Sequence, residues 1–151
     1  MRGREHLLAD MERELTLISR HQLARVAAGV LERSAYLMLS RIDATGPMTA
    51  RELARALQLE ISTVTRQVGA MLRDGLVERI PDPGGGQARR LRITPTGATR
   101  LAADRERYRT GLGRVIADWP DADRADLYRL LRALNERIEA AQGTPWPRQD
   151  S

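Results

Sequence analysis

The side chains best suited to chemistry gather on one stretch near the middle of the chain, where hydroxyl, amide and guanidinium groups recur at helical spacing. A helix is predicted from Ile61 to Asp74, because its apolar residues share one face: Val64, Val68, Met71 and Leu72. The opposite face then presents a polar set: Ser62, Thr63, Thr65, Arg66, Gln67 and Arg73. Such groups can bond to base edges in the DNA major groove or to phosphates, although a merely solvated helix face looks the same.

A helix-turn-helix is predicted to position this polar face. Thr49 and Glu52 form a capping box that starts a short helix, and residues 58–60 make a three-residue turn before the second helix. Gly75 follows the second helix, where a left-handed terminating residue is favoured. Thr49 and Arg51, at the start of the first helix, are further candidate DNA contacts.

A β-hairpin is predicted next, from Leu76 to Pro81 and from Arg89 to Thr94, each strand with one apolar face. Residues 82–88 connect the strands and include three consecutive glycines, which predicts a flexible tip. The candidate DNA contacts of this hairpin are Gln87, Arg89 and Arg90. The two arginines fit exposed strand charges as well as they fit phosphate contacts.

Amphipathic helices are expected on both sides of this module, over residues 5–29 and 34–43 before it, and over residues 95–118 and a final segment after it. Their apolar stripes exceed what a small module can cover, so we expect a homodimer. The expected fold is mainly α with a small β-hairpin wing: a winged helix-turn-helix over residues 34–98, dimerisation helices over 1–33 and 99–142, and a flexible tail over 143–151.

Charge and composition narrow the function classes. All 25 basic residues are arginine, and residues 50–100 hold nine of them against five acidic residues, while the rest of the chain is nearly balanced. This local basic excess is typical of a module that contacts phosphate. Cysteine is absent, which excludes thiol chemistry and cysteine metal sites, and the two histidines stand outside any catalytic motif. We therefore expect no enzyme activity, catalytic residue, metal or cofactor.

The chain carries no run of apolar residues long enough for a membrane span, and its first residues do not resemble a secretory signal. The expectation is a cytoplasmic protein with no membrane partner.

Four segments together resemble the MarR family of bacterial transcription regulators: Met48-Thr-Ala-Arg-Glu-Leu-Ala-Arg-Ala-Leu57, Ser62-Thr-Val-Thr-Arg66, Gly75-Leu-Val-Glu-Arg79 and Arg92-Ile-Thr-Pro-Thr-Gly97. The similarity runs from the Tyr36-Leu-Met-Leu39 segment to the last helix. It implies a dimer on a pseudo-palindromic operator, acting as a repressor. Residues 62–66 would then lie in the major groove, and the 82–90 hairpin near the minor groove.

The wing departs from the family pattern. Where the family usually has an Asp-x-Arg motif, this chain has Gly85 and Gln87. Either Arg89 or Arg90 serves instead, or the wing is loose and contributes little. We expect residues 83–87 to be mobile, because no aspartate remains there to pin an arginine.

The resemblance also implies a small-molecule effector bound between the dimer helices and the DNA module. The candidate residues on those helices are His21, Arg25, Tyr36, Arg41 and Arg105. An alternative function remains open, in which the winged helix contacts another protein instead of DNA.

Overall fold

The computed structural model describes residues 3–20 and 31–148. Its elements are α1 (Arg4–Arg20), α2 (Arg33–Thr45), α3 (Ala50–Leu57), α4 (Ile61–Arg73), β1 (Val77–Ile80), β2 (Arg90–Ile93), α5 (Pro95–Val115) and α6 (Asp121–Gln142). The prediction of a mainly α fold with a β-hairpin wing is confirmed. The expected helix over residues 5–29 is described only as far as Arg20, and its remainder lies outside the described residues.

One core holds the central module together. Helix α2 crosses its middle and packs on α3, α4, α5 and β2. Fully buried side chains meet there from each of these helices, including Met38 and Leu39 of α2, Leu53 of α3, Val64 of α4 and Leu101 of α5. Burying side chains of this size stabilises the fold by about 1.5–3 kcal/mol each. The core therefore fixes α3 and α4 relative to the hairpin.

Local signals set the ends of the elements as predicted. The Thr49 hydroxyl accepts from the Glu52 amide at 3.1 Å, and the Glu52 carboxylate accepts from the Thr49 amide at 3.0 Å, so both halves of the capping box are present. Gly75 adopts a left-handed φ of 70° after α4. Thr94 caps α5, with its side chain accepting from the Gly97 amide, and Pro95 occupies the first turn.

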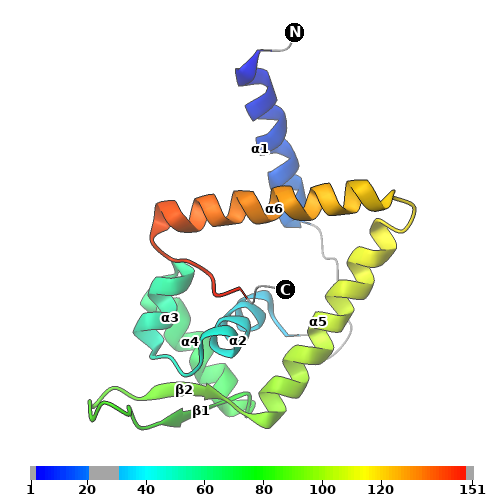
Figure 1. Ribbon diagram of the computed structural model, residues 1–151. Helices are drawn as coiled ribbons and strands as arrows, with labels where there is room; N and C mark the ends of the chain where they lie inside the picture. Colours follow the sequence, from blue (N-terminus) through cyan, green and yellow to red (C-terminus); the bar gives the residue numbers. More distant parts are fainter. Residues whose placement is uncertain (1–2, 21–30, 149–151) are drawn as a thin grey trace.

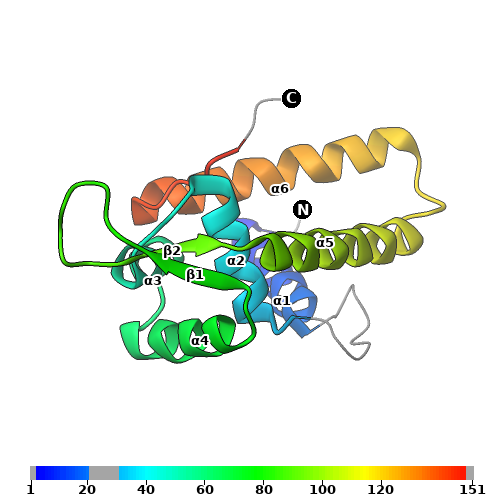
Figure 2. The ribbon, with the colours of Figure 1, turned by 90° about the horizontal axis from the view of Figure 1, so that it is seen from below.

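The hairpin pairs Val77 with Ile93 and Ile80 with Arg90 in an antiparallel register. Each strand is slightly shorter than predicted. An additional bridge joins Met48 to Leu91, with their backbone groups bonded at 2.7 and 3.1 Å. The segment before α3 is thereby attached to the edge of the wing, a contact that strand alternation alone did not predict. Figure 2 shows the hairpin projecting from the module on the side away from the α5–α6 turn.

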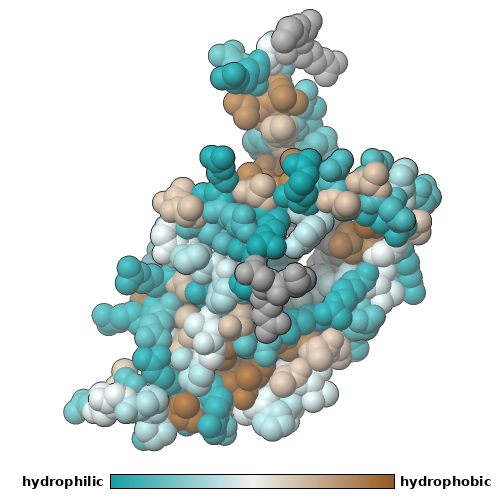
Figure 3. All heavy atoms as spheres, in the orientation of Figure 1, coloured by the Kyte–Doolittle hydropathy of each residue, from teal (hydrophilic) through white to brown (hydrophobic). Residues whose placement is uncertain are grey.

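Two helices stand largely outside the core. Neither α1 nor α6 has a buried residue, and α1 projects away from the body (Figure 1). Apolar side chains gather on the exposed part of α1 in the space-filling view (Figure 3). The exposed large apolar residues of these two helices are Leu7, Leu8, Met11, Leu15, Ile18, Tyr128, Leu130, Leu131, Leu134 and Ile138.

The described part of the segment after α6 contacts the module. Residues 143–148 turn back towards it, and the Arg41 guanidinium donates to the Pro145 carbonyl at 3.0 Å. The flexibility expected over residues 143–151 stays a prediction. Within the described ranges, no helix is both long and apolar enough to cross a membrane.

Candidate nucleic-acid interface

Helix α4 presents its polar face to solvent as predicted. Val64, Val68 and Met71 are buried beneath it. Ser62, Thr65, Arg66 and Arg73 are exposed, whereas Thr63 and Gln67 are half-buried on the flank that faces the start of α2. The outward face is therefore narrower than the six polar residues suggested: it consists of two hydroxyls near the helix N-terminus and two guanidinium groups.

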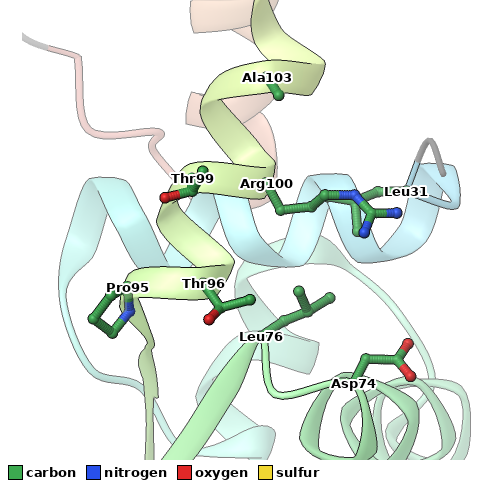
Figure 4. Close-up of a pocket in the computed structure, with 8 residues that line it drawn as sticks. All are labelled: Leu31, Asp74, Leu76, Pro95, Thr96, Thr99, Arg100 and Ala103. Carbon is green, nitrogen blue, oxygen red and sulfur yellow. The ribbon is translucent and has the colours of Figure 1, made fainter.

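A groove follows the flank of α4. One cavity of about 530 Å³ lies between the end of α4, the start of β1 and the first turns of α5, with Asp74 and Arg100 among its lining residues (Figure 4). A second cavity of about 550 Å³ shares Leu31, Asp74, Leu76 and Arg100 with it and continues to Thr63, Arg66 and Gln67. Thr63 and Gln67 therefore border a hollow between helices, as well as the outer surface.

At the start of α3, Arg51 is exposed and Thr49 is half-buried. The Thr49 hydroxyl oxygen already accepts the Glu52 amide, so the hydroxyl hydrogen is the part of this side chain left to donate to a phosphate. Both residues lie next to the wing, because Glu52 is also bonded to Arg90.

The wing is braced by Arg90. Its Nη1 atom donates to Glu52 Oε2 at 2.9 Å and to the Pro47 carbonyl at 3.3 Å, and its Nε donates to Asp82 Oδ1 at 3.3 Å. The Asp82 oxygen also accepts from the Gly84 amide at 3.1 Å, and the Asp82 carbonyl accepts from the Gly85 amide at 3.0 Å. One guanidinium thus ties the hairpin tip to the start of α3.

These contacts correct the expected wing. An aspartate does pin an arginine: it is Asp82, at the first residue of the connection, and not a residue within 83–87. Arg90 is three-quarters buried and its bonds brace the wing, while its role as a DNA contact stays a prediction. Arg89 and Gln87 are exposed. The Gly84 amide and Arg90 lower the pKa of the Asp82 carboxyl, and Asp82 and Glu52 raise the pKa of Arg90.

Arginines differ in their pairing between the module and the helices that follow. In α5, α6 and the tail, carboxylates neutralise six arginines: Arg105, Arg107, Arg109, Arg129, Arg132 and Arg148. Within the described part of the chain, no ion pair forms at Arg51, Arg66, Arg73 or Arg89. Unpaired arginines also occur in α5 and α6, for example Arg114, but most arginines there have a carboxylate partner, whereas Arg51, Arg66, Arg73 and Arg89 are exposed and available to phosphate.

The comparisons agree with this geometry. A sequence model of the MarR family matches residues 31–85. The HTH-type transcriptional regulator YxaD of Bacillus subtilis, itself uncharacterized, is 32% identical over 130 residues, which cover 83% of this chain and 91% of YxaD. This chain belongs to the MarR family.

Two further relatives extend the comparison. The structure of a MarR family protein from Bacillus stearothermophilus superposes with a TM-score of 0.76 at 23% identity, and the match covers 90% of this chain and 98% of that one. The HTH-type transcriptional repressor IacR of Pseudomonas putida is 26% identical over 98 residues, or 65% of this chain and 59% of IacR. This MarR-family chain is accordingly a transcriptional regulator of the DNA-binding type.

The predicted effector residues of this MarR-family chain separate into two places. The Tyr36 and Tyr108 rings lie 4.8 Å apart between α2 and α5, and Arg105 beside them donates to Asp43 at 2.8 Å. Burial raises the pKa of the Tyr36 hydroxyl, and Arg105 opposes that shift. Arg41 lies apart from this cluster, against the tail. His21 and Arg25 lie outside the described residues.

Sequence reasoning missed the carboxylates that organise the module. Asp104 is fully buried, accepts from the Leu31 amide at 2.8 Å and pairs with Arg107 at 2.9 Å, which ties the chain entering α2 to α5. Asp82 could have been found from its place two residues after Ile80, which is the register partner of Arg90 in a short hairpin. No spacing rule points to Asp104, because its amide partner is 73 residues away.

Proposed function

We propose that the chain is a homodimeric repressor that binds a pseudo-palindromic duplex operator, with α4 of each subunit in the major groove and the wing beside the adjacent minor groove. The observation that carries this proposal is that α4 exposes the Ser62 and Thr65 hydroxyls together with the Arg66 and Arg73 guanidinium groups, neither of which has an ion pair among the described residues. The proposed readers are Ser62, Thr65 and Arg66, with Thr63 and Gln67 at the edge of the groove. Arg51, Arg73, Arg89 and the hydroxyl of Thr49 contact phosphates, and Gln87 lies at the wing tip. The repressor role is supported by the similarity to the repressor IacR.

The test begins with selection of bound sequences from a random duplex library, followed by affinity measurements at several salt concentrations. A steep fall in affinity with salt is expected, because each neutralised phosphate releases counterions. Arg66→Ala should weaken binding, whereas Arg114→Ala, which removes an exposed unpaired arginine from α5, should not. Absence of a salt-dependent interaction with any duplex would contradict the proposal and favour a protein partner.

A second copy of the chain is the proposed partner of α1, α6 and the end of α5, which we take as the dimerisation helices. Leu112, Val115 and Trp119 extend the exposed apolar surface to the α5–α6 turn. Exposed apolar surface spread over three helices is typical of an association interface. Light scattering should give about twice the 16.9 kDa of one chain. Leu134→Asp should lower that mass, because it places a charge in the groove between α1 and α6.

We also propose that a small molecule bound beside Tyr36 and Arg105 releases the operator. Two tyrosine rings and a guanidinium with donors to spare would suit a planar anion, for which benzoate is a simple probe. Benzoate should weaken operator binding by the parent protein but not by Tyr36→Ala. Equal effects on both proteins, or none on the parent at saturating benzoate, would argue against this site for such a ligand.

A further inference from the structure

Residues 143–148, here called the C-terminal strap, reverse the chain direction after α6. Gly143 adopts a left-handed φ of 67°, and the Thr144 amide donates to the Glu139 carbonyl at 3.0 Å. This is the usual way in which a helix ends on glycine. Figure 1 shows the strap returning from the end of α6 towards α2.

One anchor holds the strap to α6. Arg148 donates to both oxygens of Glu139, at 2.6 and 2.7 Å, and the Trp146 amide donates to the same carboxylate at 3.0 Å. The side chains of Glu139 and Arg148 are only 18% and 26% exposed. A bidentate pair of this kind has a defined geometry, unlike a single contact between long surface side chains.

A second anchor holds the strap to α2. The Arg41 guanidinium lies over the Trp146 ring, 5.3 Å from its centroid, and its Nη1 donates to the Pro145 carbonyl. A cation over an indole face at this distance is attractive, the more so where water is excluded. Burial lowers the pKa of Arg41, and its Nε atom is buried without a hydrogen-bond partner among the described residues. Arg41 precedes the core residue Ile42, so this anchor is fixed to the rigid module.

The two anchors matter because α6 has little other attachment to the module. The main packing contacts of the described residues join α2, α3, α4, α5, β1 and β2, and α6 is not among them. Helix α6 is joined to α5 through the turn at residues 116–120, where Arg124 donates to the Ala117 carbonyl at 2.7 Å. A helix held at one end can swing about that end, whereas a helix held at both ends has a fixed angle.

We propose that the contact between Arg41 and Trp146 sets the angle between α6 and the winged module, and thereby the separation of the two α4 helices on DNA. Trp146 and Arg41 are positioning residues in this account and touch neither DNA nor effector. The second half of the inference rests on the proposed homodimer, because one subunit has no half-site spacing to set. A strap that served only to cap α6 would need the Glu139 pair but not a contact with residue 41, over 100 positions earlier in the sequence.

The first test measures the angle directly and needs no DNA. The chain has no cysteine, so spin labels can be placed on Glu60→Cys at the start of α4 and Arg137→Cys on α6, with excess unlabelled protein to isolate distances within one chain. The parent background should give one narrow distance distribution. Trp146→Ala should broaden it at least twofold, and Trp146→Phe, which keeps an aromatic face, should restore most of the narrow component. An unchanged distribution in Trp146→Ala would overturn the proposal.

The second test measures spacing on DNA. Operators with the half-site separation changed in one-base-pair steps should show a preference of at least tenfold for one spacing in the parent, and of less than about threefold in Trp146→Ala. Affinity for a single half-site and the mass of the dimer should stay the same in both. Equal weakening at every spacing would mean a general structural role and would overturn the positioning role. Failure of the parent itself to bind DNA would count against the proposed function, while the distance measurement would still decide the role of the strap.

Discussion

Gly97 occupies the tightest corner of the fold, and Gly97→Ala offers a sharp test of the packing. A Cβ atom there would overlap the carbonyl oxygen of Leu76 and lie 2.9 Å from its carbonyl carbon and 3.0 Å from Ile93 Cγ1. Because the Cβ would lie about 1 Å inside the 3.0 Å limit that real Cβ contacts essentially never pass, the first turn of α5 must move away from Leu76 by about 1 Å or more. The Leu76 carbonyl also accepts from the Thr94 amide at 3.0 Å, so that bond is strained as well.

The expected cost follows from these contacts. Overpacking costs about 1–3 kcal/mol and occasionally more, and the helix propensity of alanine returns at most about 1 kcal/mol. A net loss of about 2 kcal/mol in the free energy of unfolding should lower Tm by about 4–8 °C for a chain of this size. Thermal unfolding followed by circular dichroism measures the shift.

Gly113→Ala is the matched control, since Gly113 lies in the same helix and a Cβ there meets nothing within 4 Å. It should raise the free energy of unfolding by about 0.5–1 kcal/mol, because alanine favours the helix. A Gly97→Ala variant that melts at or above the parent temperature, or a shift of both variants in the same direction, would contradict the predicted clash.

The remaining predictions concern the interface, the wing and the strap. Arg66→Ala should cost about 1–3 kcal/mol at one operator base pair if Arg66 reads a guanine, and profiling of bound sequences would show the relaxed position. Arg89→Ala should reduce specific and non-specific DNA affinity by similar factors, and it should lower the slope of log affinity against log salt concentration by about one. Arg90→Ala should mainly speed hydrogen exchange at the Gly84 and Gly85 amides. A reversed pattern would contradict the bracing role of Arg90. The Arg148 pair lowers the pKa of Glu139, so its stabilisation is present above the ordinary value of 4.5 and is lost as pH falls through the lowered pKa. In a Trp119→Phe background, Trp146 fluorescence should therefore change in acid, and Glu139→Gln should shift that transition or remove it.

Sequence reasoning recovered the features whose cause is local. The capping box at Thr49 and Glu52, the left-handed Gly75 and the capped start of α5 each depend on residues within three or four positions, so a single stretch of sequence contains the whole interaction. The helical spacing of apolar residues likewise predicted which face of α4 is buried, because the core lies on one side of that helix.

Long-range pairing lay beyond that reasoning. Arg90 was interpreted from its place near the hairpin tip, but its role depends on Glu52, which is 38 residues earlier. The contact between the strap and Arg41 is of the same kind, because the Pro145 carbonyl lies 104 positions after Arg41. In both cases the sequence offers the arginine several possible acceptors, either carboxylates or backbone carbonyl groups. The fold of the backbone determines which of these acceptors lies within hydrogen-bond distance.

Because Arg90 of the wing is bonded to Glu52 of α3, the wing should not be transferred between related regulators by itself. Glu52 Oε2 accepts hydrogen bonds from both the Thr49 amide and the Arg90 guanidinium. One oxygen atom therefore caps the start of α3 and also holds the base of the hairpin. A hairpin grafted from a relative without the matching arginine would lack the side-chain bond to Glu52, and it would depend on the backbone bridge between Met48 and Leu91 for its attachment to this segment. A graft of α3 without the glutamate would leave Arg90 with Asp82 and the Pro47 carbonyl but without its link to α3. Engineered changes of operator preference in this scaffold should therefore exchange residues 49–93 as one block.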